Sequence, residues 1–158
     1  MSAGLRERAL AAASGVVDPE IPVLTIADLG VLRAVRLAGD TVEIEITPTY
    51  SGCPAMRVIE IEIETALREA GIGKFRISTV LSPAWTTDWL SAEGRRKLAA
   101  YGIAPPEGRA SRRALFGADA VICPRCGAAE TERISEFGST ACKALYRCRI
   151  CAEPFDYF

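Results

Sequence analysis

Two short cysteine pairs near the C-terminus constrain the fold of this 158-residue chain more than any other feature. The sequence reads Cys123-Pro-Arg-Cys126 and, after 21 further residues, Cys148-Arg-Ile-Cys151. Each C-x₂-C pair brings two thiolates close enough to share one metal ion, and two pairs at this separation are typical of a Cys₄ zinc ribbon. The surrounding roughly forty residues contain too few apolar side chains to form a core without such a staple. We therefore expect a zinc-ribbon β module over residues 115–158, although this spacing also fits a rubredoxin-like iron site or an iron–sulfur cluster.

The overall composition excludes several classes of function. Histidine is absent, which removes histidine acid–base catalysis and every histidine-containing metal site. The net charge of −1 gives no general attraction to nucleic acid. No apolar run reaches the ~20 residues of a membrane span, and residues 1–13 lack the apolar core of a signal peptide. We expect a cytoplasmic protein, where six cysteines favour metal or thiol chemistry over disulfides.

The first 103 residues have the pattern of a small α/β (α+β) domain. Val42, Ile44 and Ile46 alternate with polar residues, as in a half-buried strand, and Gly39-Asp40 suits the turn of a hairpin. The pattern predicts a three-stranded sheet with packed helices. The expected strands are 31–37, 41–47 and 75–81, and the expected helices are 4–14, 26–30, 54–71 and one from 88 or 91 to 101. Residues 104–114 are proline-rich and basic, and predict a linker between the two domains.

A strand–loop–helix junction at Thr47–Ala55 carries the most reactive group that we expect in this domain. Pro54 suits the first position of a helix, which makes Cys53 the expected N-cap, at the positive end of the helix dipole. A thiol in that position is biased toward the thiolate form. The alternative is a turn with a buried, inert cysteine, because free cysteine is among the most buried residue types.

Two further features are candidates for chemistry. Asp18 and Glu20 place two carboxylates in a loop stiffened by prolines, and the alternative role for Asp18 is local capping of backbone N–H groups. Cys142 lies between the two cysteine pairs. It is either a buried strand residue or a second exposed thiol that works with Cys53, and residues 138–140 favour the second because they make a good loop and a poor core.

These motifs, taken together, resemble known families. Asp18-Pro-Glu-Ile-Pro22 followed by Thr47-Pro-Thr-Tyr-Ser-Gly-Cys-Pro-Ala55 resembles the small iron–sulfur assembly domains, which include SufT-type proteins and the eukaryotic cytosolic iron–sulfur targeting factors. The ending is narrower: Cys123-Pro-Arg-Cys126-Gly, the run from Phe137 to Cys148 and Glu153-Pro-Phe-Asp-Tyr-Phe158 resemble the PaaD (PaaJ) family of bacterial phenylacetate degradation. The resemblance covers nearly the whole chain.

The resemblance implies an accessory protein of the multicomponent phenylacetyl-CoA epoxidase. That enzyme has a di-iron oxygenase and a reductase with flavin and a [2Fe–2S] cluster, and this chain contains no motif for either chemistry. By the resemblance, Cys53 matches the reactive cysteine of the family, and Asp18, Glu20 and Thr47 match positions near it. A patch of thiolate and carboxylates suits transient binding of iron or an iron–sulfur cluster.

Three functional hypotheses follow. The first is a maturation factor in which Cys53, with or without Cys142, holds iron or a cluster and passes it to a client such as the reductase. The second is a non-catalytic adaptor of the epoxidase complex that docks through its ribbon. The third is a thiol enzyme, which lacks an evident activating base. The expected partners are the epoxidase components and the iron–sulfur assembly machinery, with no nucleic acid and no membrane; a homodimer would bring two Cys53 thiols together for a bridging cluster.

Overall fold

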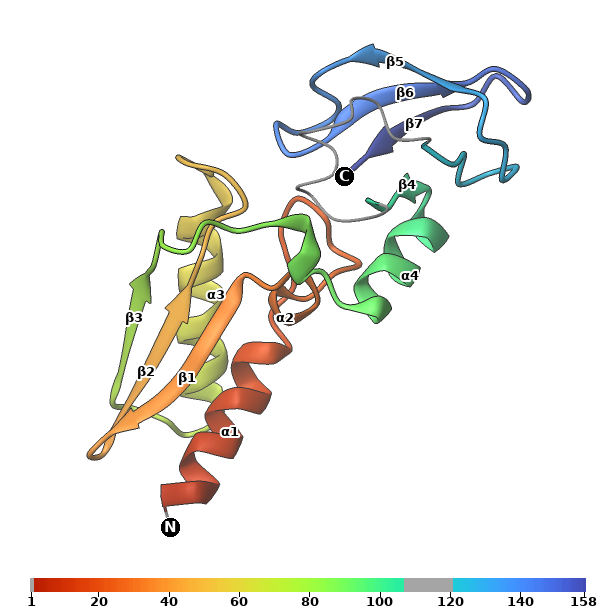
Figure 1. The fold of residues 1–158 in the computed structure, drawn as a ribbon. Helices are drawn as coiled ribbons and strands as arrows, with labels where there is room; N and C mark the ends of the chain where they lie inside the picture. The colour runs from red at the N-terminus through yellow and green to blue at the C-terminus, as the bar shows by residue number, and fades with distance from the viewer. Residues whose placement is uncertain (1, 107–120) are drawn as a thin grey trace. The chain divides into compact units, whose positions relative to one another are not determined.

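The computed structural model describes residues 2–106 and 121–158 as a mixed α/β chain with two separate sheets (Figure 1). The chain divides into two compact units, Met1–Trp85 and Thr86–Phe158. Each unit has its own sheet, so each is described by itself.

The first unit is a three-stranded sheet with helices packed on it (Figure 1). The strand order is β1-β2-β3, with β1 and β2 antiparallel and β2 and β3 parallel. Gly39, with φ +64°, forms the expected tight turn between β1 and β2. The elements are α1 (Ser2–Ser14), α2 (Ile26–Leu29), β1 (Leu32–Ala38), β2 (Thr41–Ile46), α3 (Ala55–Glu69) and β3 (Phe75–Thr79).

The core of this unit lies between β2 and α3. The alternation along β2 places Val42, Ile44 and Ile46 at 0% exposure on the side of the helices. Helix α3 covers one face of the sheet (Figure 1), and its helical spacing buries Ile63 and Leu67, also at 0% exposure. Each such side chain contributes roughly 1.5–3 kcal/mol by its burial, so this pairing anchors the loop that joins β2 to α3.

The second unit is a four-stranded sheet preceded by a helix (Figure 1). Ser91 caps α4 by accepting the N–H of Gly94 at 2.9 Å, which decides between the two helix starts, 88 and 91, that the sequence leaves open. Gly102 ends the helix with φ +93°. The strand order is β4-β7-β6-β5, in which only β4 and β7 are parallel. The elements are η1 (Thr87–Trp89), α4 (Ala92–Tyr101), β4 (Ile103–Ala104), β5 (Thr131–Ser135), β6 (Ala144–Cys148) and β7 (Pro154–Tyr157).

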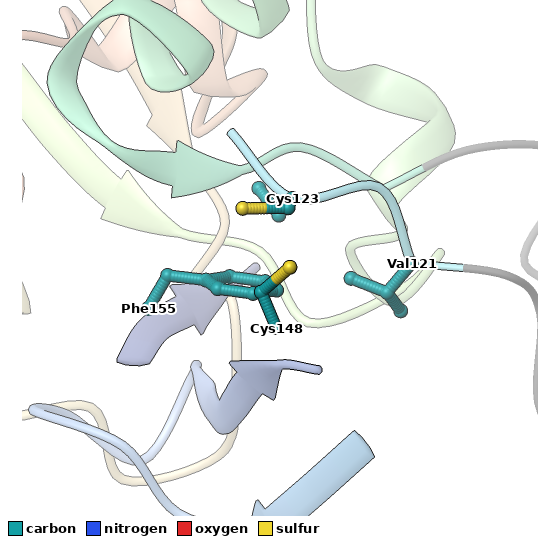
Figure 2. Close-up of a cluster of buried hydrophobic side chains, with 5 residues drawn as sticks. Val121, Cys123, Cys148 and Phe155 are labelled. Carbon is teal, nitrogen blue, oxygen red and sulfur yellow. The ribbon is translucent and has the colours of Figure 1, made fainter. Parts of the chain in front are cut away.

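The core of the second unit is small and contains two of the paired cysteines. Figure 2 shows Val121, Cys123, Cys148 and Phe155 in this buried cluster. Ala104 of β4 belongs to the same cluster. The strand before residue 107 therefore shares a core with the strands after residue 120.

The junction between the units lies earlier than the sequence indicates. Composition places a linker at residues 104–114, but Ala104 pairs with Tyr157 in the second sheet, and the division between units falls after Trp85. A strand as short as Ile103–Ala104 has no periodicity that composition could reveal. The rest of the expected linker, from residue 107 on, lies outside the described residues.

Two element boundaries also differ from expectation. Helix α3 runs from Ala55 to Glu69 and is preceded by Pro54 as its N-cap, so Cys53 is not the capping residue that the sequence predicts. Strand β3 ends at Thr79, two residues earlier than expected. In the described part of the chain, no helix is long and apolar enough to span a membrane.

Candidate functional site

The four paired cysteines converge on one point of the second unit. The Sγ atoms of Cys123, Cys126, Cys148 and Cys151 all lie within 4.8 Å of one another. The Sγ atoms of Cys123 and Cys151 are 3.7 Å apart, and those of Cys126 and Cys148 are 3.5 Å apart. Four sulfurs around a tetrahedral metal at a bond length of about 2.3 Å would be about 3.8 Å apart, so the donor set fits one metal ion.

Two backbone N–H groups in the second cysteine pair point toward the sulfur of its first cysteine. The N–H groups of Ile150 and Cys151 point at Cys148 Sγ from 3.4 and 3.5 Å. The N–H of Cys151 lowers the pKa of Cys148 to about 7, with burial opposing and Ile150 adding to the effect. A thiol that ionises this readily suits metal binding, because the ligand form of cysteine is the thiolate. Cys123 and Cys148 are buried, and Cys126 is exposed.

Cys53 lies in the loop that joins β2 to α3, one residue before the helix N-cap. Its thiol is half-buried, and its N–H donates to the carbonyl of Tyr50 at 3.3 Å. Burial raises the pKa of Cys53, against the lowering effect of the Ala55 N–H and the Tyr50 side chain, and the charges of Glu20 and Asp18 raise it further. The expected bias toward thiolate is therefore wrong for this position, because desolvation and negative charge outweigh the helix terminus.

The charges of Glu20 and Asp18 act on Cys53, so the structure brings all three side chains into one region. The Asp18 carboxylate is buried, and its Oδ1 accepts the N–H groups of Glu20 at 2.8 Å and Ile21 at 2.9 Å. This is local capping, the alternative role that the sequence allows for Asp18. Glu20 is half-buried. The acceptor of these two hydrogen bonds is the Asp18 carboxylate and not the Glu20 carboxylate.

Thr47 is a structural residue at the start of the same loop. Its side chain is buried at 1% exposure, and its hydroxyl donates to the Val80 carbonyl at 2.7 Å. Its N–H donates to the Val31 carbonyl at 2.9 Å. Thr47 thus ties the Cys53 loop to the segments that follow β3 and precede β1.

Cys142 belongs to the second unit, in the loop between β5 and β6. It is half-buried, and its Sγ lies 3.0 Å from Thr140 Oγ1. The loop is held by Asp156, whose carboxylate accepts the Ser139 hydroxyl at 2.7 Å and lies 4.0 Å from the Nζ of the buried Lys143. Cys142 therefore lies in a loop and not in a strand, but it is half-buried where the sequence favours an exposed thiol, and its cooperation with Cys53 stays a prediction.

A cavity of about 130 Å³ beside the Cys53 loop was not predicted from the sequence. Trp85 lines it, and the indole Nε1 donates to the Leu29 carbonyl at 2.7 Å, which fixes the ring. No pattern in the sequence indicates this cavity, since it depends on the chain folding back after β3. The other lining residues are Thr47, Pro48, Thr49, Tyr50, Ser51, Leu81 and Ala84.

Comparisons with known proteins match the two halves of the chain separately. Residues 6–78 match the iron–sulfur cluster assembly protein family, and residues 107–158 match the PaaD zinc beta ribbon domain. A protein of Escherichia coli (strain K12), named as a putative subunit of 1,2-phenylacetyl-CoA epoxidase, is 51% identical over 145 residues, which is 92% of this chain and 87% of that protein.

Two other similarities each cover a smaller share of the chain. The Fe-S protein maturation auxiliary factor YitW of Bacillus subtilis (strain 168) is 33% identical over 58% of this chain and 90% of its own length. The crystal structure of a domain of unknown function, DUF59, from Bacillus anthracis aligns with a TM-score of 0.56 at 22% identity over 61% of this chain and 93% of that one. This last similarity shows the fold alone.

Proposed function

Because this chain belongs to the PaaD family, together with the putative epoxidase subunit of Escherichia coli, we propose that it is a non-catalytic accessory factor that helps to assemble an iron–sulfur or metal centre in the epoxidase. The relative YitW is named as a maturation factor, and the Escherichia coli relative is named as part of the epoxidase. The two names together support a factor that serves one enzyme complex.

The observation that carries the proposal is the grouping of Cys53 with Glu20 and Asp18 in the iron–sulfur assembly domain. The Cys53 thiol and the Glu20 carboxylate offer a soft and a hard donor, which suits iron as cargo, while Asp18 caps the loop that carries Glu20. The raised pKa of Cys53 means that cargo binding must displace a proton, which is released to water. That cost weakens the binding, as a transfer site requires.

The four-cysteine centre has a different role in this proposal. We assign it to a zinc ion with a structural function, because four thiolates fill the tetrahedral coordination and leave no open position for a substrate. Structural zinc contributes on the order of 10–16 kcal/mol in small modules at neutral pH, which suits the small core of this unit.

The client in this proposal is an epoxidase component such as the reductase, loaded with the help of the iron–sulfur assembly machinery. The protein would act in the cytoplasm, where its cysteines stay reduced. Catalysis by Cys53 is not part of the proposal, because a thiol with a raised pKa and no histidine nearby is poorly activated.

A second function has one observation in its favour: the Escherichia coli relative is named as a subunit of the epoxidase. An adaptor would co-purify stably with the oxygenase or reductase. Its complex would be lost when Cys123 or Cys148 is changed to serine, since the ribbon would then lose its metal. Cys53→Ser would leave that complex intact.

The decisive experiment measures iron and acid-labile sulfide in the client reductase after anaerobic co-expression with this protein. Cys53→Ser should keep its zinc and its fold but leave the client depleted of its cluster. Cys142→Ser is the matched control and, if Cys53 acts alone, leaves the client fully loaded. Full client occupancy with Cys53→Ser would refute the maturation role and leave the adaptor.

A further inference from the structure

Among the described residues, no strand pairs with the outer edge of strand β3. The N–H of Val42 donates to the Lys74 carbonyl at 3.0 Å, and the N–H of Val80 donates to the Ile46 carbonyl at 2.8 Å. The even-numbered residues of this segment therefore face β2, and the alternation of a strand turns the odd-numbered ones outward. Those that face outward are Phe75, Ile77 and Thr79, and none of them has an inter-strand partner on that side within residues 2–106 and 121–158.

The other edge of the same sheet is protected. Strand β1 has a bulge between Leu32 and Ala34, and the Nε of Arg6 on α1 donates to the Val35 carbonyl at 3.1 Å. Bulges and covering side chains are the usual devices that prevent an edge from pairing with another chain. Strand β3 pairs with β2 without a bulge, and it contains no proline.

The charged residues of β3 do not block its edge either. Arg76 pairs with Glu43 on β2, at 3.4 Å, and Lys74 pairs with Asp40 at the hairpin turn. Both exposed cations are thereby paired with carboxylates on β2 and at its hairpin turn, on the side away from the outer edge. Charged side chains protect an edge only when they stand over it, so β3 remains open.

We propose that the β3 edge pairs with β3 of a second copy of this chain, in antiparallel orientation, to form one continuous six-stranded sheet. Around a two-fold axis at Ile77, each outward-facing group finds a partner. Ile77 lies opposite Ile77 of the second copy, and Phe75 lies opposite Thr79 of the second copy. Strand addition at an open edge is a recurrent mode of protein recognition.

The side chains beside this edge are compatible with a second copy. On the solvent face, Arg76 would lie opposite Ser78 of the second copy, so like charges do not meet directly. On the helical face, Arg68 lies 5.5 Å over the ring of Phe75 and pairs with Glu64 at 2.5 Å. That flank of α3 carries both signs of charge and does not repel its symmetry mate.

This pairing gives the Cys53 loops a definite arrangement. Cys53 lies in the loop that follows the C-terminal end of β2. Because β2 and β3 are parallel, the C-terminal end of β3 lies at the same edge of the sheet. Antiparallel β3 strands point these ends in opposite directions, about 20 Å apart for three residues on each side of the axis at roughly 3.3 Å per residue. Two separate thiol sites result, rather than the bridging site that a dimer would otherwise offer.

Sedimentation velocity of the full-length, zinc-loaded protein over a concentration series tests the proposal. The interface is small, so we expect weak, concentration-dependent association of the native chain. Thr79→Pro removes an outward N–H and leaves the bonds to β2 intact, and it should keep the monomer sedimentation coefficient at every concentration. Arg36→Ala, on the far strand β1, is the matched control and should associate like the native protein.

Hydrogen exchange of the Ile77 amide gives a second measurement. Its exchange should slow as the native protein is concentrated, while in Thr79→Pro it should stay fast. If Thr79→Pro does not fold, Thr79→Lys blocks the edge by charge instead. A native protein that stays monomeric, an associating Thr79→Lys, or protection of Ile77 that is independent of concentration would each overturn the proposal.

Discussion

Gly127 and Ala152 occupy equivalent positions, each immediately after the second cysteine of a C-x₂-C pair, and both have left-handed backbones with φ +76° and +63°. The two turns therefore have the same geometry, although only one contains glycine. A Cβ makes this conformation unfavourable, and Ala152 is the one non-glycine residue of the described chain with positive φ. The second pair is held in its turn despite local strain.

We predict that Gly127→Ala and Ala152→Gly change the free energy of unfolding in opposite directions. Gly127→Ala should lower the free energy of unfolding by about 1 kcal/mol, because a Cβ there meets no atom within 4 Å and only backbone strain is added. Ala152→Gly should raise it by less than about 1 kcal/mol, since glycine also gains entropy in the unfolded chain. Urea unfolding at saturating zinc measures both, and a change of the same sign in both variants would contradict the strain argument.

Removal of the metal should unfold the second unit alone. The buried cluster of this unit includes Cys123 and Cys148 themselves, so the core loses the cross-link that stabilises it when the metal leaves. Amide signals of β5 to β7 should collapse on treatment with a strong chelator, while those of β1 to β3 persist. Cys148→Ser should behave like the chelated protein and Cys142→Ser like the native one; loss of both units together would contradict the prediction.

The alkylation rate of Cys53 should rise with pH over a higher pH range than the rate of an ordinary cysteine. Its pKa is raised, so its thiolate fraction at pH 7 is below that of an ordinary cysteine, and the rate should still be rising above about pH 8.5. Glu20→Gln removes a charge that raises this pKa, so it should shift the profile to lower pH. The measurement uses iodoacetamide on a zinc-loaded Cys142→Ser background. Glu69→Gln, at the far end of α3, is the control and should leave the profile unchanged.

Asp18 should act through folding, not through cargo. Asp18→Ala leaves the N–H groups of Glu20 and Ile21 without their acceptor and should cost about 1–3 kcal/mol of stability. Asp18→Asn keeps a side-chain oxygen and should cost less. Thermal unfolding measures the loss; if Asp18→Ala is as stable as the native protein yet fails to load the client, Asp18 is a cargo ligand instead.

The parts of the fold that follow from short-range patterns were predictable. The alternation along β2, the helix expected at 54–71 and the cysteine spacing each depend on residues within one element or one repeated motif. The structure contains the strand, the helix and the cluster of four cysteines. The end of α4 at Tyr101 agrees with the expected end at 101, because the glycine that follows it strongly favours a helix end.

The parts that depend on distant contacts were not predictable. The pKa of Cys53 rises because the fold buries the thiol and brings Glu20 and Asp18 beside it, although both lie far from it in sequence. Local rules about helix ends could not include that burial. The short strand β4 likewise exists only because β7, at the other end of the unit, pairs with it.

Ala104 and Val121 lie in one buried cluster, although the chain between them contains the segment from residue 107 to 120. Both ends of that segment are consequently anchored in the same core. If a protease cut within this segment, the two pieces would stay associated through that core. A domain inserted there would leave both of its attachment points in the ribbon core. The chain passes from the first unit to the second instead at the peptide that joins Trp85 to Thr86.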